Sequence, residues 1–171
     1  MSSISWPRKY LPGTTDNFVS NETYVCGITA AQVWNYVVDV SQWESYYKNV
    51  AQITPPKSGP RLSKGDEFSF STFGFPPLKA QCGESIEPTA STAGRLGWRA
   101  WQEGDEATAL DIYHAWIVED MDWGAVRILT QESQIGKPAA QLAETKPNPM
   151  LNGHQDWIDG LVRITKSNNP A

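Results

Sequence analysis

The sequence has few of the residues from which cofactor sites and disulfide frameworks are built. Its 171 residues include two cysteines, Cys26 and Cys82, and two histidines, His114 and His154. Two cysteines are too few for a disulfide scaffold, and neither CxxC nor HExxH spacing occurs, so no zinc site is expected. No GxGxxG or GxxxxGK[ST] segment is present to hold a nucleotide phosphate. The sequence therefore predicts two reduced thiols, no metal and no cofactor.

Basic residues and long apolar runs are also scarce. The chain has 14 Lys and Arg against 19 Asp and Glu, a net charge of -5. Nucleic acids and anionic membrane surfaces are bound by clustered basic residues, so neither is an expected partner. No run of 18 apolar residues exists to span a membrane, and the first residues lack the apolar core of a signal peptide. These absences predict a cytoplasmic protein.

Tryptophan is abundant by contrast. The chain has eight tryptophans, and aromatic residues make up 11% of it. Aromatic side chains bury large areas in protein cores, and they also line ligand cavities. Composition does not choose between a heavily aromatic core and an aromatic cavity wall.

The first third of the chain changes from irregular to strand to helix. Residues 1–15 contain two prolines and a glycine and are expected to form an irregular arm. Residues 17–28 are rich in β-branched and aromatic types and predict a strand. Capping boxes at Thr29–Gln32 and Ser41–Glu44 then predict two short helices in tandem. Residues 54–66 are expected to form a loop because of their proline, glycine and serine content.

Alternating polar and apolar residues dominate the middle of the chain and predict strands joined by turns, which favours an antiparallel meander. The expected strands cover residues 67–72, 78–87, 95–101, 110–119 and 125–136. After a short helix following Lys137, Asn148 can cap a new helix with Pro149 at its first position. An apolar stripe then runs along residues 150–166.

Two glycines lie seven residues apart within this last helix, at Gly153 and Gly160. Glycine inside a helix costs roughly 1 kcal/mol relative to alanine. We therefore expect a close backbone approach on this face of the helix.

This order of elements predicts an α+β fold with one domain over residues 16–167 and a short tail at 168–171. A curved antiparallel sheet of six to seven strands would grip the long C-terminal helix, with two short helices after the first strand. A curved sheet around a helix leaves a space that large side chains or a ligand must fill. An internal ligand cavity is therefore expected.

At this point the chain resembles the START-like, or SRPBCC, superfamily with its helix-grip fold. The resembling segments are Thr29–Tyr47, Leu96–Trp98, His114–Trp116 and the last strand with Thr130-x-Glu132 and Gly136. The resemblance implies binding of a hydrophobic small molecule such as a lipid, a hormone or a polyketide. Some members catalyse cyclisation or dehydration without a cofactor, whereas others only carry their ligand. No universal catalytic residue comes with the fold.

Three residues are candidates for catalysis: His114, Glu132 and His154. His114 alternates with Ile112 and Trp116 on an apolar strand face. It is either a hydrogen-bonded core histidine or a donor or base for a bound carbonyl. His154 lies within the apolar stripe of the last helix, either facing the sheet or reaching solvent at the stripe's edge. Glu132 would pair with His114 if its strand turns it inward, but the register that decides this depends on the preceding turn.

A second set of residues is expected to line the ligand site. Glu84 shares an apolar-patterned strand face, where it would either be a carboxyl with a raised pKa or mark the strand's return to solvent. The aromatic candidates for the cavity wall, each of which could instead be core, are Trp43, Tyr47, Trp98, Trp116 and Trp157.

Two functions follow from these residues. The first is a cofactor-independent enzyme of secondary metabolism that holds a hydrophobic polyketide- or terpenoid-like intermediate and promotes its cyclisation. The reaction would be an aldol or dehydrative closure, or a pericyclic addition such as a [4+2], and the cavity would lower its entropic barrier by orienting the chain. The alternative is a non-catalytic carrier or sensor of a lipid or another small hydrophobic ligand.

Overall fold

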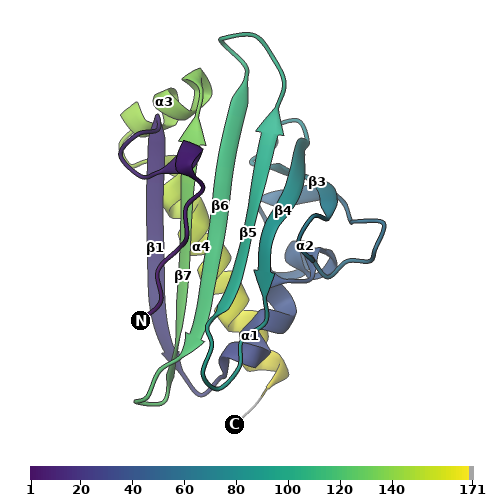
Figure 1. The fold of residues 1–171 in the computed structure, drawn as a ribbon, viewed down its shortest axis with the longest axis vertical. Coiled ribbons are helices and arrows are strands. Elements are labelled where there is room, and N and C mark those ends of the chain that lie inside the picture. Colours follow the sequence, from purple (N-terminus) through teal and green to yellow (C-terminus); the bar gives the residue numbers. More distant parts are fainter. Residues whose placement is uncertain (170–171) are drawn as a thin grey trace.

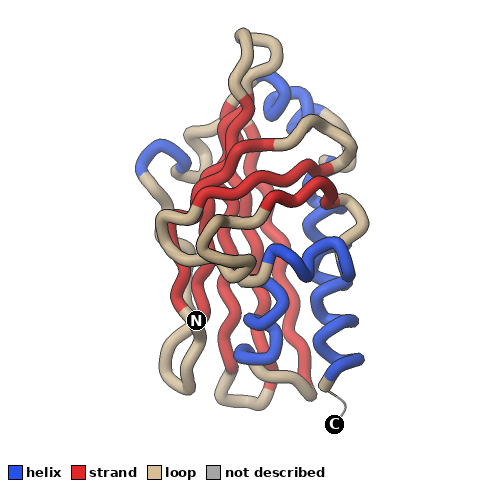
Figure 2. Tube along the Cα trace, turned by 90° about the vertical axis from the view of Figure 1, so that its right-hand side faces the viewer, coloured by secondary structure: helices blue, strands red, loops and turns tan. Residues whose placement is uncertain are grey.

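The computed structural model describes residues 1–169 as one seven-stranded antiparallel sheet with a long helix lying across one face (Figures 1 and 2). The strand order is β1-β7-β6-β5-β4-β3-β2, so β2 to β7 form a meander and the first strand pairs with the last. The elements are η1 (Arg8–Tyr10), β1 (Asn17–Cys26), α1 (Ala30–Val37), η2 (Val40–Gln42), α2 (Trp43–Tyr46), β2 (Val50–Thr54), β3 (Glu67–Thr72), β4 (Leu78–Ile86), β5 (Gly94–Gln102), β6 (Leu110–Asp120), β7 (Ala125–Ile135), α3 (Lys137–Glu144) and α4 (Pro149–Asn168). This architecture confirms the predicted helix-grip arrangement. Of the described helices, none is both long and apolar enough to cross a membrane.

Two of the three predicted caps are confirmed, whereas the box predicted at Ser41–Glu44 does not form, because Asp39 caps η2 by accepting from the backbone N–H of Ser41 and α2 has no side-chain cap. Thr29 Oγ1 accepts a hydrogen bond from the backbone N–H of Gln32, and Gln32 Oε1 accepts one from the backbone N–H of Thr29, which closes the capping box of α1. Asn148 Oδ1 accepts from the backbone N–H of Met150, with Pro149 at the first position of α4. Local hydrogen bonding of short polar side chains thus fixes where these helices begin.

Three details of the predicted layout differ from the structure: one strand, the N-terminal arm and the start of the C-terminal tail. The strand β2 was not predicted, because it is a short edge strand in which only Val50 is buried and its sequence shows no alternation. The N-terminal arm contains the short helix η1 and packs on the sheet through the buried Ile4 and Tyr10. The predicted tail at 168–171 begins too early, since α4 continues to Asn168, and residues 170–171 lie outside the described part.

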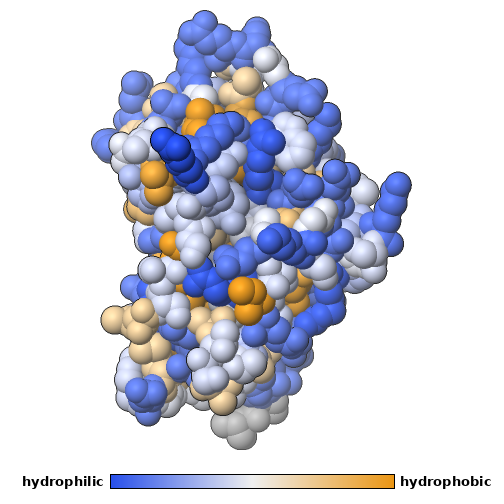
Figure 3. Space-filling view, viewed as in Figure 1, coloured by the Kyte–Doolittle hydropathy of each residue, from blue (hydrophilic) through white to orange (hydrophobic). Residues whose placement is uncertain are grey.

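The two faces of the sheet carry cores of different size. The larger core lies between the sheet and the helices α1, α2 and α4, and it contains most of the buried aromatic rings. The smaller one lies under the N-terminal arm on the other face, around Tyr10, Tyr113 and Ile117. Figure 3 shows this arm-covered face as mainly hydrophilic, with hydrophobic side chains in small separate patches. The helix side is therefore the place to look for an apolar ligand site.

The helix α4 comes very close to α2 at Gly160. A Cβ at this position would lie 2.0 Å from the backbone oxygen of Tyr46, so only glycine fits without movement. A Cβ at Gly153 would lie 2.3 Å from Cζ of Phe73, which belongs to the turn between β3 and β4. The predicted close backbone approach is confirmed at Gly160, whereas Gly153 faces a side chain. Space between α4 and α2 is consequently minimal near Gly160.

Candidate functional site

A cavity of about 620 Å³ lies between the sheet and the N-terminal half of α4. It is bordered by α3, by the β5–β6 loop and by the β3–β4 turn, and these segments are far from α1 in Figure 1. Its size is that of pockets that enclose small organic molecules. Most of its lining is apolar, and the polar exceptions include His114, Glu132 and His154. The three residues expected to be catalytic therefore share one cavity.

His114 and Glu132 are direct neighbours across the β6–β7 pair. Glu132 points inward, and its Oε2 lies 3.0 Å from Nδ1 of His114. The other ring nitrogen of His114, Nε2, is hydrogen-bonded to Oγ1 of Thr130 at 2.6 Å. The carboxylate accepts from Nδ1–H, so the neutral imidazole has its acceptor nitrogen at Nε2, where the threonine hydroxyl donates. The hydroxyl and the carboxylate together select one tautomer of His114.

His154 reaches the same carboxylate from α4. Its Nε2 lies 3.5 Å from Oε2 of Glu132, and its ring stacks on that of His114 with 4.5 Å between centroids. Both histidines are almost fully buried, with 2% and 1% of their surfaces exposed. Nδ1 of His154 has no hydrogen-bond partner within residues 1–169. One imidazole nitrogen of the site is thus not engaged by the protein.

A chain of amides holds Glu132 in place. Gln134 donates a hydrogen bond to Oε1 of Glu132, and Asn17 donates to Oε1 of Gln134 at 2.7 Å. Asn148 in turn donates to Oδ1 of Asn17 at 2.8 Å. Because Asn148 also caps α4, the start of that helix is tied to the carboxylate through β1 and β7. This network fixes one carboxylate oxygen and leaves the other to the two histidines.

Burial and hydrogen bonding set the charges of this cluster. Burial would raise the pKa of Glu132, but hydrogen bonds from His114 and His154 and their charge bring that pKa well below its usual range. Burial, followed by the neighbouring His154, lowers the pKa of His114 to about 4, although Glu132 opposes this shift. Near neutral pH the site therefore contains an ionised carboxylate beside a neutral His114.

The predicted aromatic wall divides into two groups. Tyr47 and Trp157 line the cavity and stack on each other, with centroids 4.4 Å apart and ring planes 12° apart. The expectation for Trp43, Trp98 and Trp116 is wrong, because these rings are fully buried in the core and do not border the cavity. They fill the space beside the closely packed half of α4. They act on the site indirectly, since Trp98 and Trp116 pack against the ring of His114.

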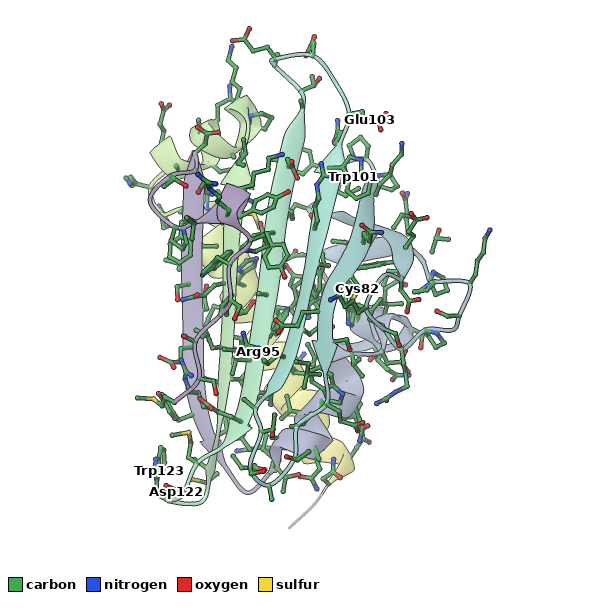
Figure 4. The ribbon with its side chains drawn as sticks, viewed as in Figure 1. Cys82, Arg95, Trp101, Glu103, Asp122 and Trp123 are labelled. Atoms are coloured by element: carbon green, nitrogen blue, oxygen red, sulfur yellow. The ribbon has the colours of Figure 1, made fainter. Side chains whose placement is uncertain are left out.

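The expectation that Glu84 faces the ligand is also wrong. The pairing of β4 with β5 shifts by one residue between Cys82 and Glu84, and such a bulge changes the face to which the following side chains point. Glu84 forms an ion pair with Arg95, whose Nε lies 2.9 Å from its Oε1. Arg95, labelled in Figure 4, also donates to the backbone oxygen of Ser3 in the N-terminal arm. Glu84 therefore holds the arm on the opposite face of the sheet.

Several cavity residues were not singled out in the sequence. Gln134 alternates with Glu132 on the same strand face, so its parity could have identified it. The rim comes from segments that no strand pattern covers, namely the β3–β4 turn, the β5–β6 loop and α3. The rim residues are Phe73, Phe75, Pro76, Ala107, Thr108, Pro138, Gln141, Leu142 and Thr145.

Comparison with solved structures shows the same fold in several proteins. Norcoclaurine synthase of Thalictrum flavum has 11% identity and a TM-score of 0.63 over 89% of this chain and 95% of its own. The di-domain ARO/CYC protein BexL of the BE-7585A biosynthetic pathway has 13% identity and a TM-score of 0.61, and the match covers 90% of this chain and 48% of BexL. At these identities the likeness shows the fold alone. No family model and no curated protein matches the chain.

A much closer likeness exists to a bacterial protein of solved structure. The hypothetical protein jhp0584 of Helicobacter pylori is 46% identical, with a TM-score of 0.91, and the match covers 96% of this chain and 97% of the bacterial one. Identity at this level over nearly the whole length is that of homologous proteins. This chain belongs to the same family as the Helicobacter pylori protein jhp0584.

Proposed function

We propose that the protein is an enzyme that binds a hydrophobic, carbonyl-bearing small molecule in its cavity and promotes cyclisation of that molecule. The observation that carries this proposal is the cluster of His114, Glu132 and His154 at the polar part of an otherwise apolar cavity. A buried carboxylate next to two imidazoles costs stability, because the charge is removed from water, and a protein that only encloses an apolar ligand does not need it. Its presence favours chemistry over simple carriage.

The cavity and the cluster have separate tasks in this proposal. The apolar walls, among them Tyr47 and Trp157, would hold a flexible molecule in a folded shape and so reduce the entropy lost on the way to the transition state. The cluster would act on the carbonyl group, by polarising it or by moving a proton next to it. With protein groups alone, the unengaged Nδ1 of His154 is the available base, and Glu132 would stabilise the imidazolium that forms.

Two fold neighbours support the choice of reaction. Norcoclaurine synthase and the ARO/CYC protein share the fold, and their names denote a synthase and a cyclase. We extend to this chain only the general idea that a helix-grip cavity can host ring formation. Aldol closure with loss of water and a pericyclic [4+2] closure both fit a cavity with few charged groups.

The test is incubation of the purified protein with a panel of linear polyketone and polyene aldehydes, followed by mass spectrometry. Cyclisation gives a product of unchanged mass, and dehydrative closure gives a product lighter by one water. His154→Ala should lower turnover by about 10²- to 10⁴-fold. Cys26→Ser, an exposed residue outside the cavity, is the control and should retain turnover.

Ligand binding measured by tryptophan fluorescence separates the outcomes. Binding without conversion of any precursor would assign the protein to the carriers or sensors. Conversion that is equal in wild type and His154→Ala would remove the cluster from the reaction. Absence of both binding and conversion across the panel would overturn the proposal.

A further inference from the structure

The three polar side chains of the cavity also have the geometry of a metal-ligand set. One ligand atom from each of His114, Glu132 and His154 lies within 4.8 Å of the other two. Oε2 of Glu132 is 3.0 Å from Nδ1 of His114 and 3.5 Å from Nε2 of His154. An ion with bonds of about 2.0–2.2 Å holds neighbouring ligand atoms roughly 2.9–3.5 Å apart. The two short separations therefore match edges of one coordination polyhedron, and the third edge requires one of the two stacked rings to turn so that both nitrogens point at the ion.

The cluster joins one buried carboxyl group to two buried imidazoles. Among the described residues that line the cavity there is no lysine or arginine. Buried charges in proteins are generally paired or coordinate a metal. A divalent cation would supply a positive charge beside the carboxyl group of Glu132 and take the place of protons on its ligand atoms.

Hydrogen bonds from outside the cluster orient the ligand atoms. Thr130 holds Nε2 of His114, so Nδ1 faces Glu132. To bind an ion, His114 would exchange tautomer, with Nδ1 giving up its proton and Nε2–H donating to Oγ1 of Thr130. Gln134 holds Oε1 of Glu132, so Oε2 faces both histidines. Supporting contacts of this kind are regular features of metal sites, where they fix the ring orientation and the tautomer.

We propose that His114, Glu132 and His154 bind one divalent first-row transition-metal ion, with its remaining coordination positions open to the cavity. Two histidines and one carboxylate form the ligand set of catalytic zinc sites and of non-haem iron(II) sites. Three protein ligands leave at least one position for an exchangeable group. Because all three side chains line the cavity, a bound carbonyl oxygen could take that position and be polarised by the ion. Metal binding stands apart from the proposed function, and only this use of the ion rests on it.

The site escapes searches for local spacing because its ligands are far apart in the sequence. His114 and Glu132 come from adjacent strands, and His154 comes from the helix that crosses them. The chain has only two histidines, and both belong to the cluster. Any metal binding that depends on imidazole must therefore occur here. No other imidazole in the chain can therefore contribute to the metal binding that the test measures.

The test uses full-length protein without a histidine tag, treated with a chelator and desalted. We expect one equivalent of Zn²⁺ to bind in competition with a chromophoric chelator, and Co²⁺ to give visible absorption bands that report nitrogen and oxygen ligands. Glu132→Gln and His154→Ala should each weaken Zn²⁺ binding by about 100-fold or more. Thr130→Val, which removes only the support of His114, should weaken it by about 10- to 100-fold.

Two control variants show whether Zn²⁺ binds at a different place on the chain. Cys26→Ser removes the exposed thiol, which is the other plausible zinc ligand, and should bind Zn²⁺ as the wild type does. Gln141→Ala changes the cavity rim without touching a ligand and should also bind normally. Circular dichroism checks that each variant is folded. The Co²⁺ spectrum of the wild type needs no variant, so the result does not depend on whether a substituted chain folds.

The proposal is overturned if the tag-free wild type binds neither Zn²⁺ nor Co²⁺, or if Glu132→Gln and His154→Ala bind as tightly as the wild type. Ligand binding to the chelator-treated protein is measured separately. A protein that binds ligand but no metal refutes this inference alone, whereas a protein that binds metal but no ligand refutes the proposed function alone.

Discussion

The contact between α4 and α2 allows a quantitative test of how the helix is seated. A Cβ at Gly160 would lie 2.0 Å from the backbone oxygen of Tyr46 and 3.0 Å from its carbonyl carbon. Both are backbone atoms, so a rotamer change cannot relieve the overlap and the helix itself must move. Gly160→Ala adds helix propensity of about 1 kcal/mol, and overpacking costs roughly 1–3 kcal/mol. Taking the upper value for a backbone clash gives a net loss of about 2 kcal/mol.

This loss corresponds to a melting temperature lowered by about 4–8 °C for a chain of this length. Gly153→Ala is the matched control on the same helix. Its new Cβ would meet the tip of the Phe73 ring at 2.3 Å, and that side chain belongs to a turn and can rotate away. We expect its stability to stay within about 1 kcal/mol of the wild type. Urea unfolding and calorimetry measure both variants, and a Gly160→Ala protein as stable as the wild type would refute the reasoning.

The remaining predictions concern the thiols, the core and acid stability. Native protein should react with one equivalent of a thiol reagent, because Cys26 is exposed whereas burial raises the pKa of the Cys82 thiol to about 12, and a second equivalent should react after unfolding. Trp98→Ala should lower the free energy of unfolding by roughly 3–5 kcal/mol in urea titrations, because its fully buried indole is in the core. Burial would raise the pKa of Asp111, but hydrogen bonds from Arg99, Lys9 and Tyr10 hold it below its ordinary value. The stabilisation from this carboxylate is thus complete above its unfolded pKa of about 3.9 and is lost as the pH falls toward the folded value. Unfolding curves of the wild type and Asp111→Asn should converge as the pH is lowered through this range, and a constant difference would contradict the assignment.

Local patterns in the sequence determined most of the elements and several of their ends. The capping box at Thr29 and the Asn148–Pro149 start of α4 depend on side chains that bond to nearby backbone atoms, so they can be predicted without tertiary structure. Alternation in strands β3 to β7 reflects the burial of one sheet face, so these strands could also be predicted from the sequence. The order of these elements was enough to predict the helix-grip fold.

The sequence also placed the two histidines correctly on inward faces. His114 follows the parity of Ile112 and Trp116, and His154 follows the helical spacing of Met150 and Trp157. All six side chains are buried. The period of 2 residues in a strand and of 3.6 residues in a helix determines to which face of the element a side chain points. It does not determine what lies opposite a side chain, so their roles remain predictions.

Only the tertiary structure decided how these residues meet. Glu132 faces His114 because the turn between β6 and β7 sets the pairing register, and a shift of one residue would have turned it to the other face. The bulge at Gly83 did turn Glu84 away, and the isolated glycine inside the strand was its local signal, which alternation alone does not use. The division of the tryptophans between core and cavity depends on the distance between α4 and the sheet. That distance is set by many contacts at once, and it is therefore a property of the packed molecule and not of any single segment.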